Sequence, residues 1–326
     1  MKHLISVVLL LAGLPHATLA DDAPRPNIVF IMADDMGFGD LGCYNPESKI
    51  PTPHMDRLAA GGLRFTDAHT PAAVCTPTRY SVLTGRYCWR RKKKGVLGGY
   101  SPPLIENSRP TIASILKKQG YTTACIGKWH IGATFHTSDG RPTTREKEID
   151  FTAAITNGPN ALGFDYAYWH AGSGTTAPPY GFIENERFVS KSFTRREMPH
   201  GDNGMVEEGW VTANADPILT QKACEFLMKS ASKDKPFFLY LAPNAPHEPC
   251  VEAVVPEFAR GKSKAGHRGD LVWLFDWKVG RVIKALEAAD QADNTMVIVT
   301  SDNGALPGDF ARDENGRRKS RPGRNW

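Results

Sequence analysis

Three apolar runs and the helical segments between them predict an α/β fold with a mostly parallel central sheet flanked by helices. The runs cover residues 26–32, 236–242 and 295–300, and each has the length and continuity of a strand buried on both faces. Residues 269–289 carry apolar residues at helical spacing and predict a long amphipathic helix. The chain of 326 residues is long enough to enclose one extensive core, so we expect a single α/β domain over residues 21–326.

Residues 1–20 have the pattern of a secretory signal peptide. Lys2 precedes an apolar run over residues 4–14, and small residues lead to Ala20. We expect cleavage near Ala20 and a periplasmic or secreted mature chain. The apolar run is too short for a permanent bilayer span, so no stable membrane anchor is predicted.

The charge balance and the cysteine count argue against two classes of protein. There are 40 Lys and Arg residues against 35 Asp and Glu residues, which gives a formal charge of +5. So small a surplus does not favour a nucleic-acid partner. Six cysteines are too sparse for a disulfide scaffold, and their pairing stays open.

The first predicted strand, residues 26–32, leads to Asp34 and Asp35. Adjacent side chains on a strand point to opposite faces, so the two carboxylates can address one point only if the chain has already turned. That places them at the carboxyl end of a strand, where open α/β sheets bind ligands. Paired hard oxygen ligands suit Mg²⁺ or Ca²⁺.

Residues 37–42 match GxGxxG after this strand, a pattern found in dinucleotide-binding proteins. Two carboxylates would precede the supposed pyrophosphate site, and the prolines that follow cannot continue a helix. We therefore favour a glycine-rich loop that positions the metal site, and retention of NAD by the purified chain would contradict this. Residues 54–61 are expected to form the next helix.

Residues 75–86 predict a short helix with a reactive residue at its start. Thr76 is the expected N-cap, Pro77 suits the first helical position and Gly85 suits the end. The helix N-terminus would favour an anionic or oxyanion-forming group at Cys75. Arg79 follows four residues later, which brings its guanidinium group back toward Cys75. The stretch therefore predicts an anion receptor that contains a nucleophile.

A second helix and a second strand-like segment follow. Residues 108–120 predict a helix with Ile112, Ile115 and Leu116 on one face. Residues 121–127 are strand-like, and Lys128 and His130 fall on one face if the chain stays extended. A cation and a proton carrier would then face the same cavity.

Periodicity fades over residues 133–216, which are rich in Gly, Pro and aromatic residues. Irregular insertions of this kind commonly shape a substrate pocket. Its aromatic residues could hold a sugar ring, but they could equally be ordinary loop packing, and a substrate role for His170 is the less favoured interpretation.

The last third of the chain predicts further elements of the sheet. Asp216 is the expected cap of a helix that runs to about residue 230, with Leu219 and Leu227 on its apolar face. The strand at 236–242 leads to His247. The strand at 295–300 is expected to be buried, and it leads to Asp302 and Asn303, whose oxygens can complete the cage begun at Asp34 and Asp35.

Two motifs resemble those of the type I sulfatases of the alkaline phosphatase superfamily. The first is C-x-P-x-R followed by T-G-R, and it fixes five residues: Cys75, Pro77, Arg79, Gly85 and Arg86. The second is the segment Gly-Lys-Trp-His at residues 127–130. The likeness extends from about residue 26 to residue 304, and its segments follow the family's order.

The resemblance implies an alkaline-phosphatase-like fold and a modified nucleophile. Cys75 would be oxidised to formylglycine by a formylglycine-generating enzyme. One divalent cation, usually Ca²⁺ with Mg²⁺ as the alternative, would be held by the modified Cys75 and by four oxygen-bearing side chains: Asp34, Asp35, Asp302 and Asn303. The remaining catalytic residues implied by the resemblance are Arg79, Lys128, His130 and His247.

The roles implied for these four residues follow the chemistry of a negatively charged ester. Arg79 would steady the formylglycine, and Lys128 would contact both it and the sulfate. His130 would take the proton whose loss releases sulfate, and His247 would lie near the leaving-group oxygen. The expected function is hydrolysis of aryl or carbohydrate sulfates, with a sulfated small molecule or glycan as substrate.

Two alternatives remain open at this stage. One is a phosphodiesterase or phosphonate monoester hydrolase of the same superfamily. The other is an inactive secreted binder of sulfated glycans. Family members normally continue to a second sulfate-contacting Lys and a smaller C-terminal antiparallel domain, whereas this sequence stops at Trp326 and Lys319 has no matching context. We therefore expect a catalytic domain that is incomplete at the C-terminus.

Overall fold

The computed structural model describes residues 25–91 and 95–305. The predicted signal peptide and the tail that contains Lys319 lie outside the described residues. The strands are β1 (Asn27–Ala33), β2 (Thr122–Lys128), β3 (Phe135–His136), β4 (Pro142–Thr143), β5 (Tyr166–His170), β6 (Ile183–Glu184), β7 (Arg187–Phe188), β8 (Phe193–Arg196), β9 (Gly204–Glu207), β10 (Phe237–Ala242) and β11 (Thr295–Ser301). The α-helices are α1 (Pro53–Ala60), α2 (Cys75–Thr84), α3 (Ile112–Lys118), α4 (Thr212–Ala231) and α5 (Gly266–Ala288).

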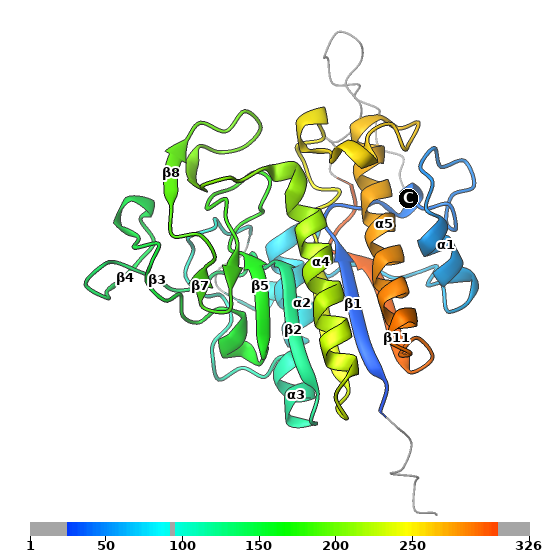
Figure 1. Ribbon diagram of the computed structural model, residues 1–326, viewed down its shortest axis with the longest axis horizontal. Coiled ribbons are helices and arrows are strands. Elements are labelled where there is room, and N and C mark those ends of the chain that lie inside the picture. Colours follow the sequence, from blue (N-terminus) through cyan, green and yellow to red (C-terminus); the bar gives the residue numbers. More distant parts are fainter. Residues whose placement is uncertain (1–24, 92–94, 306–326) are drawn as a thin grey trace, which may run out of the picture.

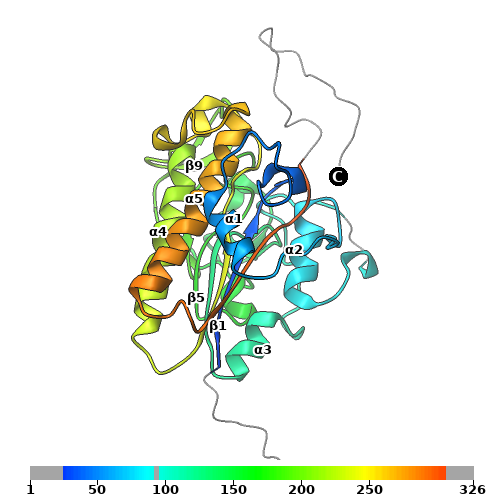
Figure 2. The ribbon, with the colours of Figure 1, turned by 90° about the vertical axis from the view of Figure 1, so that its right-hand side faces the viewer.

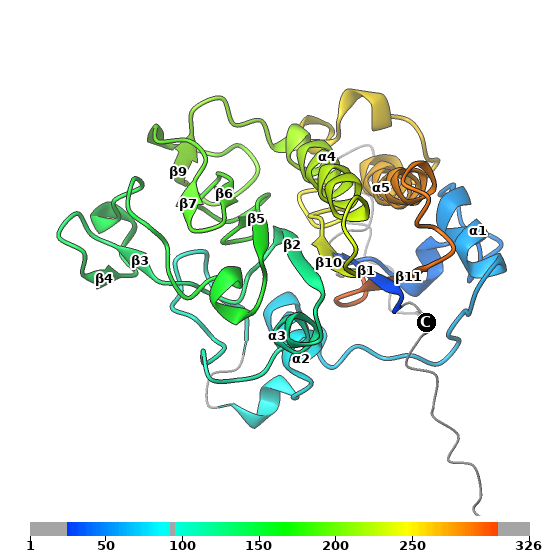
Figure 3. The same ribbon diagram turned by 60° about the horizontal axis from the view of Figure 1, so that its bottom comes forward.

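The central sheet has the strand order β11-β1-β10-β2-β5-β6-β7 (Figures 1 and 3). The strands from β11 to β5 are parallel, while β6 and β7 extend the sheet in antiparallel fashion. Ile31 of β1 lies opposite Leu241 of β10 on one side and Val299 of β11 on the other. This arrangement confirms the predicted α/β fold with a mostly parallel sheet.

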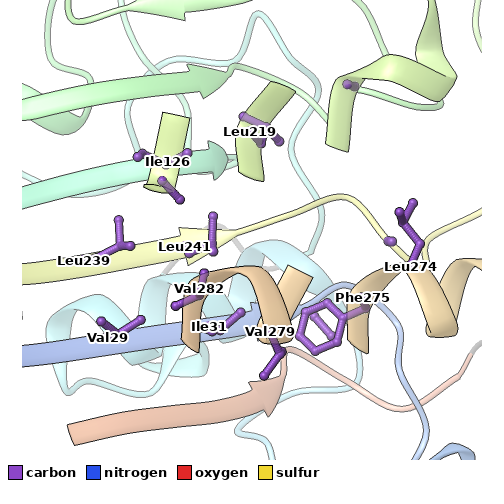
Figure 4. Packing of buried hydrophobic residues seen from close by; sticks show 14 of the residues in the cluster. Val29, Ile31, Ile126, Leu219, Leu239, Leu241, Leu274, Phe275, Val279 and Val282 are labelled. Atoms are coloured by element: carbon purple, nitrogen blue, oxygen red, sulfur yellow. The ribbon is translucent and has the colours of Figure 1, made fainter. Parts of the chain in front are cut away.

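Helices cover both faces of the sheet. Helices α1, α4 and α5 lie on one side, and α2 and α3 lie on the other (Figures 2 and 3). The side chains of β1 alternate between the two layers, with Val29 and Ile31 in one apolar cluster and Met32 in the other. Figure 4 shows Val29, Ile31 and the corresponding residues of β10 beneath the apolar face of α5. Strands covered on both faces explain why the sequence runs are continuously apolar.

Several predicted elements have different bounds or contacts. Helix α2 begins at Cys75 itself, and its N-cap is Val74. The hydroxyl of Thr76 is not a cap: it donates to the carbonyl of His130 at 2.9 Å and accepts from the backbone N–H of Leu97 at 3.2 Å. Gly85 ends the helix with a left-handed φ of 63°, as its lack of a Cβ allows.

The predicted apolar face of α3 is wrong for two of its residues. Ile112 and Ile115 are exposed, whereas Ala113 is buried and Leu116 is partly buried against the core. The helix begins later than predicted, because Thr111 caps it by accepting from the backbone N–H of Ser114.

Helix α4 begins earlier than predicted, at Thr212, and Pro217 lies inside it. Asp216 therefore does not cap the helix. The predicted apolar face is confirmed, because Leu219 and Leu227 are both fully buried.

Strand β11 was expected to be buried on both faces, and the structure contradicts this. In the part of the chain that the structure describes, β11 is the edge strand of the sheet, with Met296 52% and Ile298 36% exposed. Strand β5 was not predicted, because it lies in the stretch without periodicity. After β1, residues 38–40 form only a short 3₁₀ turn rather than a long helix. None of the described helices combines the length and apolarity needed to cross a bilayer.

Candidate active site

The candidate site forms where the carboxyl ends of four parallel strands meet the start of α2. Because these strands are neighbours in the sheet, residues far apart in the sequence come together there. Strands β1, β2, β10 and β11 and helix α2 supply the residues predicted for the site: Asp34, Asp35, Cys75, Arg79, Lys128, His247, Asp302 and Asn303. All of them are buried.

The chain turns sharply after β1. Asp35 has a left-handed φ of 66°, which is uncommon for a residue with a side chain. Its backbone N–H donates to Oδ1 of Asp302 at 3.1 Å, and the N–H of Asp34 donates to the carbonyl of Ala245 at 3.3 Å. The turn expected from the paired carboxylates is therefore present, and it is held by hydrogen bonds donated to Asp302, just after β11, and to the loop after β10.

Two cations and two carboxylates form a network closed to solvent. Nζ of Lys128 lies 2.6 Å from Oδ2 of Asp34. Nη2 of Arg79 lies 2.7 Å from Oδ2 of Asp302 and 3.1 Å from Oδ1 of Asp34. Nη1 of Arg79 also donates to the carbonyl of Lys128 at 3.1 Å. Although burial opposes it, the positive charges of Lys128 and Arg79 hold the pKa of Asp34 well below its usual range.

Cys75 lies at the first residue of α2, and its Sγ is 3.5 Å from Nζ of Lys128. Burial raises the pKa of the Cys75 thiol to about 12, and the charge of Lys128 offsets only part of that effect. The unmodified thiol is therefore not the anion that the helix N-terminus would favour, and the expectation of an anionic or oxyanion-forming group at Cys75 stays a prediction for the modified residue. An unmodified Cys75 is neutral at physiological pH and a poor nucleophile.

The carboxylates lie close enough together to impede one another's ionisation. Burial and the charge of Asp34 raise the pKa of Asp35 to about 7, and the same two causes raise that of Asp302 to about 6. Asn303 donates from Nδ2 to Oδ1 of Asp35 at 2.5 Å. A bound divalent cation would relieve this repulsion.

The donor atoms fit a hard cation. Among the described residues, Oδ2 of Asp35, Oδ1 of Asn303 and Oδ1 of Asp34 are buried and have no hydrogen-bond partner, although Nη2 of Arg79 lies 3.1 Å from Oδ1 of Asp34. Ligand atoms of Asp34, Asp35, Cys75 and His247 lie within 4.8 Å of one another. Unpaired carboxylate and amide oxygens in a buried site are the ligands that Ca²⁺ or Mg²⁺ prefers.

Asp302 differs from the other predicted ligands. Both of its oxygens already accept hydrogen bonds, Oδ1 from the backbone of Asp35 and Oδ2 from Arg79. The structure therefore places Asp302 beside the carboxylate pair, where it orients Asp35 and Arg79. Its predicted role as a metal ligand stays a prediction.

His130 does not lie on an extended strand. Strand β2 ends at Lys128, and His130 has a left-handed φ of 55°, so the condition for Lys128 and His130 to share one strand face is not met. Nε2 of His130 lies 2.6 Å from the carbonyl of Leu97, while Nδ1 is buried and has no partner among the described residues. Since a carbonyl only accepts, Nε2 carries the hydrogen and Nδ1 is the basic nitrogen. Burial, aided by Lys128 and Arg79, lowers the pKa of His130 well below its usual range.

His247 lies at the rim of the carboxylate pair. Its Nε2 is 3.6 Å from Oδ2 of Asp35, and its Nδ1 is 2.7 Å from the carbonyl of Glu248. His170, by contrast, is fully buried between Phe182 and Trp210, and its nearest polar contacts are with Gly181 and Asn244. The structure therefore gives His170 a packing role.

Sequence reasoning missed two residues that support the site. Arg268 of α5 donates to both carboxylate oxygens of Asp40, at 2.8 and 2.7 Å, and to the carbonyl of Asp35 at 3.2 Å. Thr175 donates to the carbonyl of Glu248 at 2.9 Å and thereby braces the segment that carries His247. Neither residue belongs to a motif, so nothing in the sequence pattern singled them out.

The fold and this cluster define an α/β protein with a buried charged site at the carboxyl edge of its sheet. Comparison with known proteins gives the family: the Sulfatase family model matches residues 26–325, and the chain belongs to that family. The chain is 34% identical to an N-acetylgalactosamine-6-O-sulfatase of Bacteroides thetaiotaomicron, over 90% of this chain and 61% of that protein. It is 32% identical to the steryl-sulfatase of Rattus norvegicus, over 92% of this chain and 59% of the relative.

Solved structures agree with this assignment. A structure from work on glycosaminoglycan metabolism by Bacteroides thetaiotaomicron matches with a TM-score of 0.76 and 32% identity, covering 87% of this chain and 64% of the other. A phosphonate monoester hydrolase of Agrobacterium radiobacter shares the fold, with a TM-score of 0.52 and 19% identity. The chain spans about three fifths of the length of the curated relatives named above.

Proposed function

We propose that this protein hydrolyses sulfate esters, with Cys75 converted to formylglycine by a formylglycine-generating enzyme. The observation that supports the proposal best is the series of contacts from Cys75 through Lys128 to Asp34. It joins the residue to be modified, a buried cation and a carboxylate with an unsatisfied oxygen. A formylglycine hydrate would supply two hydroxyls on one carbon: attack of one on sulfur would expel the alcohol, and loss of the other's proton would allow the carbon–oxygen bond to break, which frees sulfate and restores the aldehyde.

The charged residues prepare the site for an anionic ester. Lys128 holds its ammonium group beside the side chain at position 75, where it can also contact a sulfate oxygen. Arg79 contacts Asp34 and Asp302 and thereby holds the carboxylate network close to the modified residue. Asp34, Asp35 and Asn303 offer unsatisfied oxygens for a divalent cation, and we propose that Asp302 and the modified Cys75 complete its ligands. The cation, which we propose is Ca²⁺ or Mg²⁺, supplies electrostatic stabilisation of negative charge.

The two histidines differ in their environments and in their proposed roles. Nδ1 of His130 has no partner in the described part of the chain and is the basic nitrogen of the ring, and we assign to it the removal of the proton that releases sulfate. His247 lies beside Asp35, with its Nε2 3.6 Å from Oδ2 of that carboxylate, and we place it beside the leaving-group oxygen.

We propose a carbohydrate sulfate as the substrate and an exported location. One of the relatives named above is an N-acetylgalactosamine-6-O-sulfatase, and the human N-acetylgalactosamine-6-sulfatase is 33% identical over 88% of this chain. The secretory pattern in residues 1–20 supports export.

Two measurements test this function. Mass spectrometry of the peptide containing Cys75, from protein made in its native host, should find formylglycine; unmodified thiol throughout the sample would count heavily against catalysis. Turnover of matched aryl sulfate and aryl phosphodiester substrates should favour the sulfate. Dominant phosphodiester turnover would instead indicate a phosphodiesterase or phosphonate monoester hydrolase of the same superfamily. Binding of sulfated glycans without release of sulfate, by protein loaded with metal and aldehyde, would support a binding protein instead.

A further inference from the structure

We propose that Asp216, together with Lys278, is a positioning residue for His247. Neither belongs to a motif of the family resemblance, and both lie in long helices on the opposite face of the sheet from Cys75. Asp216 is in α4 and Lys278 is in α5. The inference rests on the proposed function, because it assigns a role to His247.

The contacts of Asp216 are directed at one loop. Its Oδ1 accepts from the backbone N–H of Asn244 at 2.8 Å and from Nδ2 of the same residue at 3.3 Å. Its Oδ2 accepts from the backbone N–H of Ala245 at 2.8 Å. Because Asp216 lies in the second turn of α4, its carboxylate is not needed to cap that helix. It binds the two N–H groups that follow the end of β10 instead.

The same loop reaches the candidate site by two further bonds. The N–H of His247 donates to the carbonyl of Asn244 at 2.9 Å. The carbonyl of Ala245 accepts from the N–H of Asp34 at 3.3 Å. Asn244 and Ala245 are therefore held by Asp216 on one side and connected to His247 and Asp34 on the other. A change at Asp216 is expected to move His247 relative to Asp35.

Lys278 stabilises the buried carboxylate of Asp216. Its side chain is fully buried, and its ammonium group forms an ion pair with Oδ2 of Asp216. A buried charge without a partner is strongly destabilising, so the ion pair and the two backbone N–H donors together hold the carboxylate of Asp216 in one orientation. The ion pair also connects α4 to α5. An experiment therefore has to distinguish a purely structural role of Asp216 and Lys278 from their positioning of His247.

The first experiment compares Asp216→Asn with a matched control, Asp276→Asn. Asp276 is also buried, and it accepts from the backbone N–H groups of His54 and Met55 at the start of α1, away from the site. We expect both variants to lose stability. Only Asp216→Asn should lower kcat for an aryl sulfate, by about 10- to 100-fold as for other residues that orient a ligand, and only this variant should speed hydrogen exchange at the amides of Asn244 and Ala245. Unchanged exchange, or equal kcat in the two variants, would overturn the proposal.

A double-mutant cycle with His247→Ala provides the second test. If Asp216 acts through His247, then Asp216→Asn lowers kcat in the wild-type background but adds no further loss to His247→Ala. Losses that multiply would show that Asp216 acts elsewhere, and the proposal would fail.

A third variant keeps the proposal testable if Asp216→Asn does not fold. Lys278→Met removes the charge but keeps the length of the side chain, and we expect it to change the same two measurements in the same direction. If kcat and the exchange at Asn244 and Ala245 are unchanged in Lys278→Met, the proposed role of the ion pair between Lys278 and Asp216 is overturned. The exchange measurement does not depend on turnover. A wild-type protein that releases no sulfate would therefore refute the proposed function, while faster exchange at Asn244 and Ala245 would still support the positioning of the loop.

Discussion

The ammonium group of Lys128 lies 3.5 Å from the sulfur of Cys75, although 53 residues separate them in the sequence. The contact forms because β2 ends at Lys128 and α2 begins at Cys75, so a strand end and a helix start meet at the same edge of the sheet. The same ammonium lies 2.6 Å from Asp34. Lys128 is thus shared between the residue to be modified and the carboxylate network, and its loss should affect both catalysis and stability.

We expect Lys128→Met to reduce kcat for an aryl sulfate by about 100-fold or more, as removal of one preorganised donor does in other enzymes. The variant should also be less stable by about 3 to 5 kcal/mol in the absence of metal, because Asp34 loses a buried partner. Steady-state kinetics and urea unfolding measure the two effects.

The control for this variant is Lys117→Met. Lys117 lies 2.6 Å from Asp165, and its side chain is about half exposed, so its ion pair should contribute less than about 1 kcal/mol. Equal losses of stability in Lys117→Met and Lys128→Met would contradict the buried network as the source of the effect.

Arg79→Lys should be far from conservative. The guanidinium contacts Asp302, Asp34 and the carbonyl of Lys128 at the same time, and it is fully buried. A lysine offers one compact ammonium group and cannot make these contacts in the same geometry, so we expect a loss of about 3 kcal/mol or more in unfolding free energy. Thermal and chemical unfolding of Arg109→Lys, which changes a surface pair with Glu106, supply the comparison. If Arg79→Lys lost no more unfolding free energy than Arg109→Lys, the charged network would be more open to water than the structure describes.

Local pattern was sufficient to predict four strands of the central sheet, β1, β2, β10 and β11. Strands β1 and β10 are continuous apolar runs because both of their faces are covered, and such runs can be recognised in the sequence. Strand β5 has no recognisable sequence pattern, because it is short and lies between irregular segments. The exposed side chains of Met296 and Ile298 could not be anticipated either, since an apolar run does not show which face is covered.

The candidate site was predictable only in its residue types. The acidic pair after β1, the Asp302 and Asn303 side chains after β11 and the motif around Cys75 indicated the cluster. The contact of His130 with Leu97, the left-handed backbone of His130 and the bonds from Asp216 to Asn244 are tertiary features. They join residues that are distant in the sequence, and no local spacing encodes them. The raised pKa of the Cys75 thiol could not be anticipated for a related reason, because burial depends on the whole fold.

Asp35→Asn should separate metal binding from folding. Without metal, the change removes one carboxylate from a site where Asp34 already opposes ionisation, so we expect equal or greater stability. With Ca²⁺ the variant should bind at least about 10-fold more weakly, because an oxygen free to coordinate the cation is lost. Calorimetric titration and thermal unfolding, each with and without a chelator, measure this.

Asp67→Asn is the control for metal binding, since Asp67 is exposed and lies outside the site. Its Ca²⁺ affinity and its gain in stability with Ca²⁺ should equal those of the wild type. If Asp35→Asn behaved in the same way as Asp67→Asn, the cation site would have to lie elsewhere in the protein.

Glu207 should make stability depend on pH in a direction unusual for a carboxylate. It is buried at the end of β9, and its Oε2 accepts from the backbone N–H of Phe182 at 3.2 Å. Burial raises the pKa of Glu207 to about 7, well above the value near 4.3 expected in the unfolded chain. Between these two values the folded protein holds a proton that the unfolded chain has lost, so the contribution of Glu207 to stability falls as pH rises and is constant above about pH 7.

Glu207→Gln removes this titration while keeping an oxygen for the N–H of Phe182. We therefore expect the variant to resemble the wild type near pH 4 and to be the more stable protein at pH 8, with the gap widening by at most about 1.4 kcal/mol per pH unit. Urea unfolding between pH 4 and pH 8 gives the unfolding free energy of the wild type and of the variant at each pH. The contributions of other titrating groups cancel in the difference between the two proteins. Glu208→Gln is the matched control, because Glu208 is adjacent in the sequence and its side chain is exposed. This substitution should leave the dependence of stability on pH parallel to that of the wild type. A parallel curve for Glu207→Gln would mean that Glu207 is ionised in the folded protein at the same pH as in the unfolded chain.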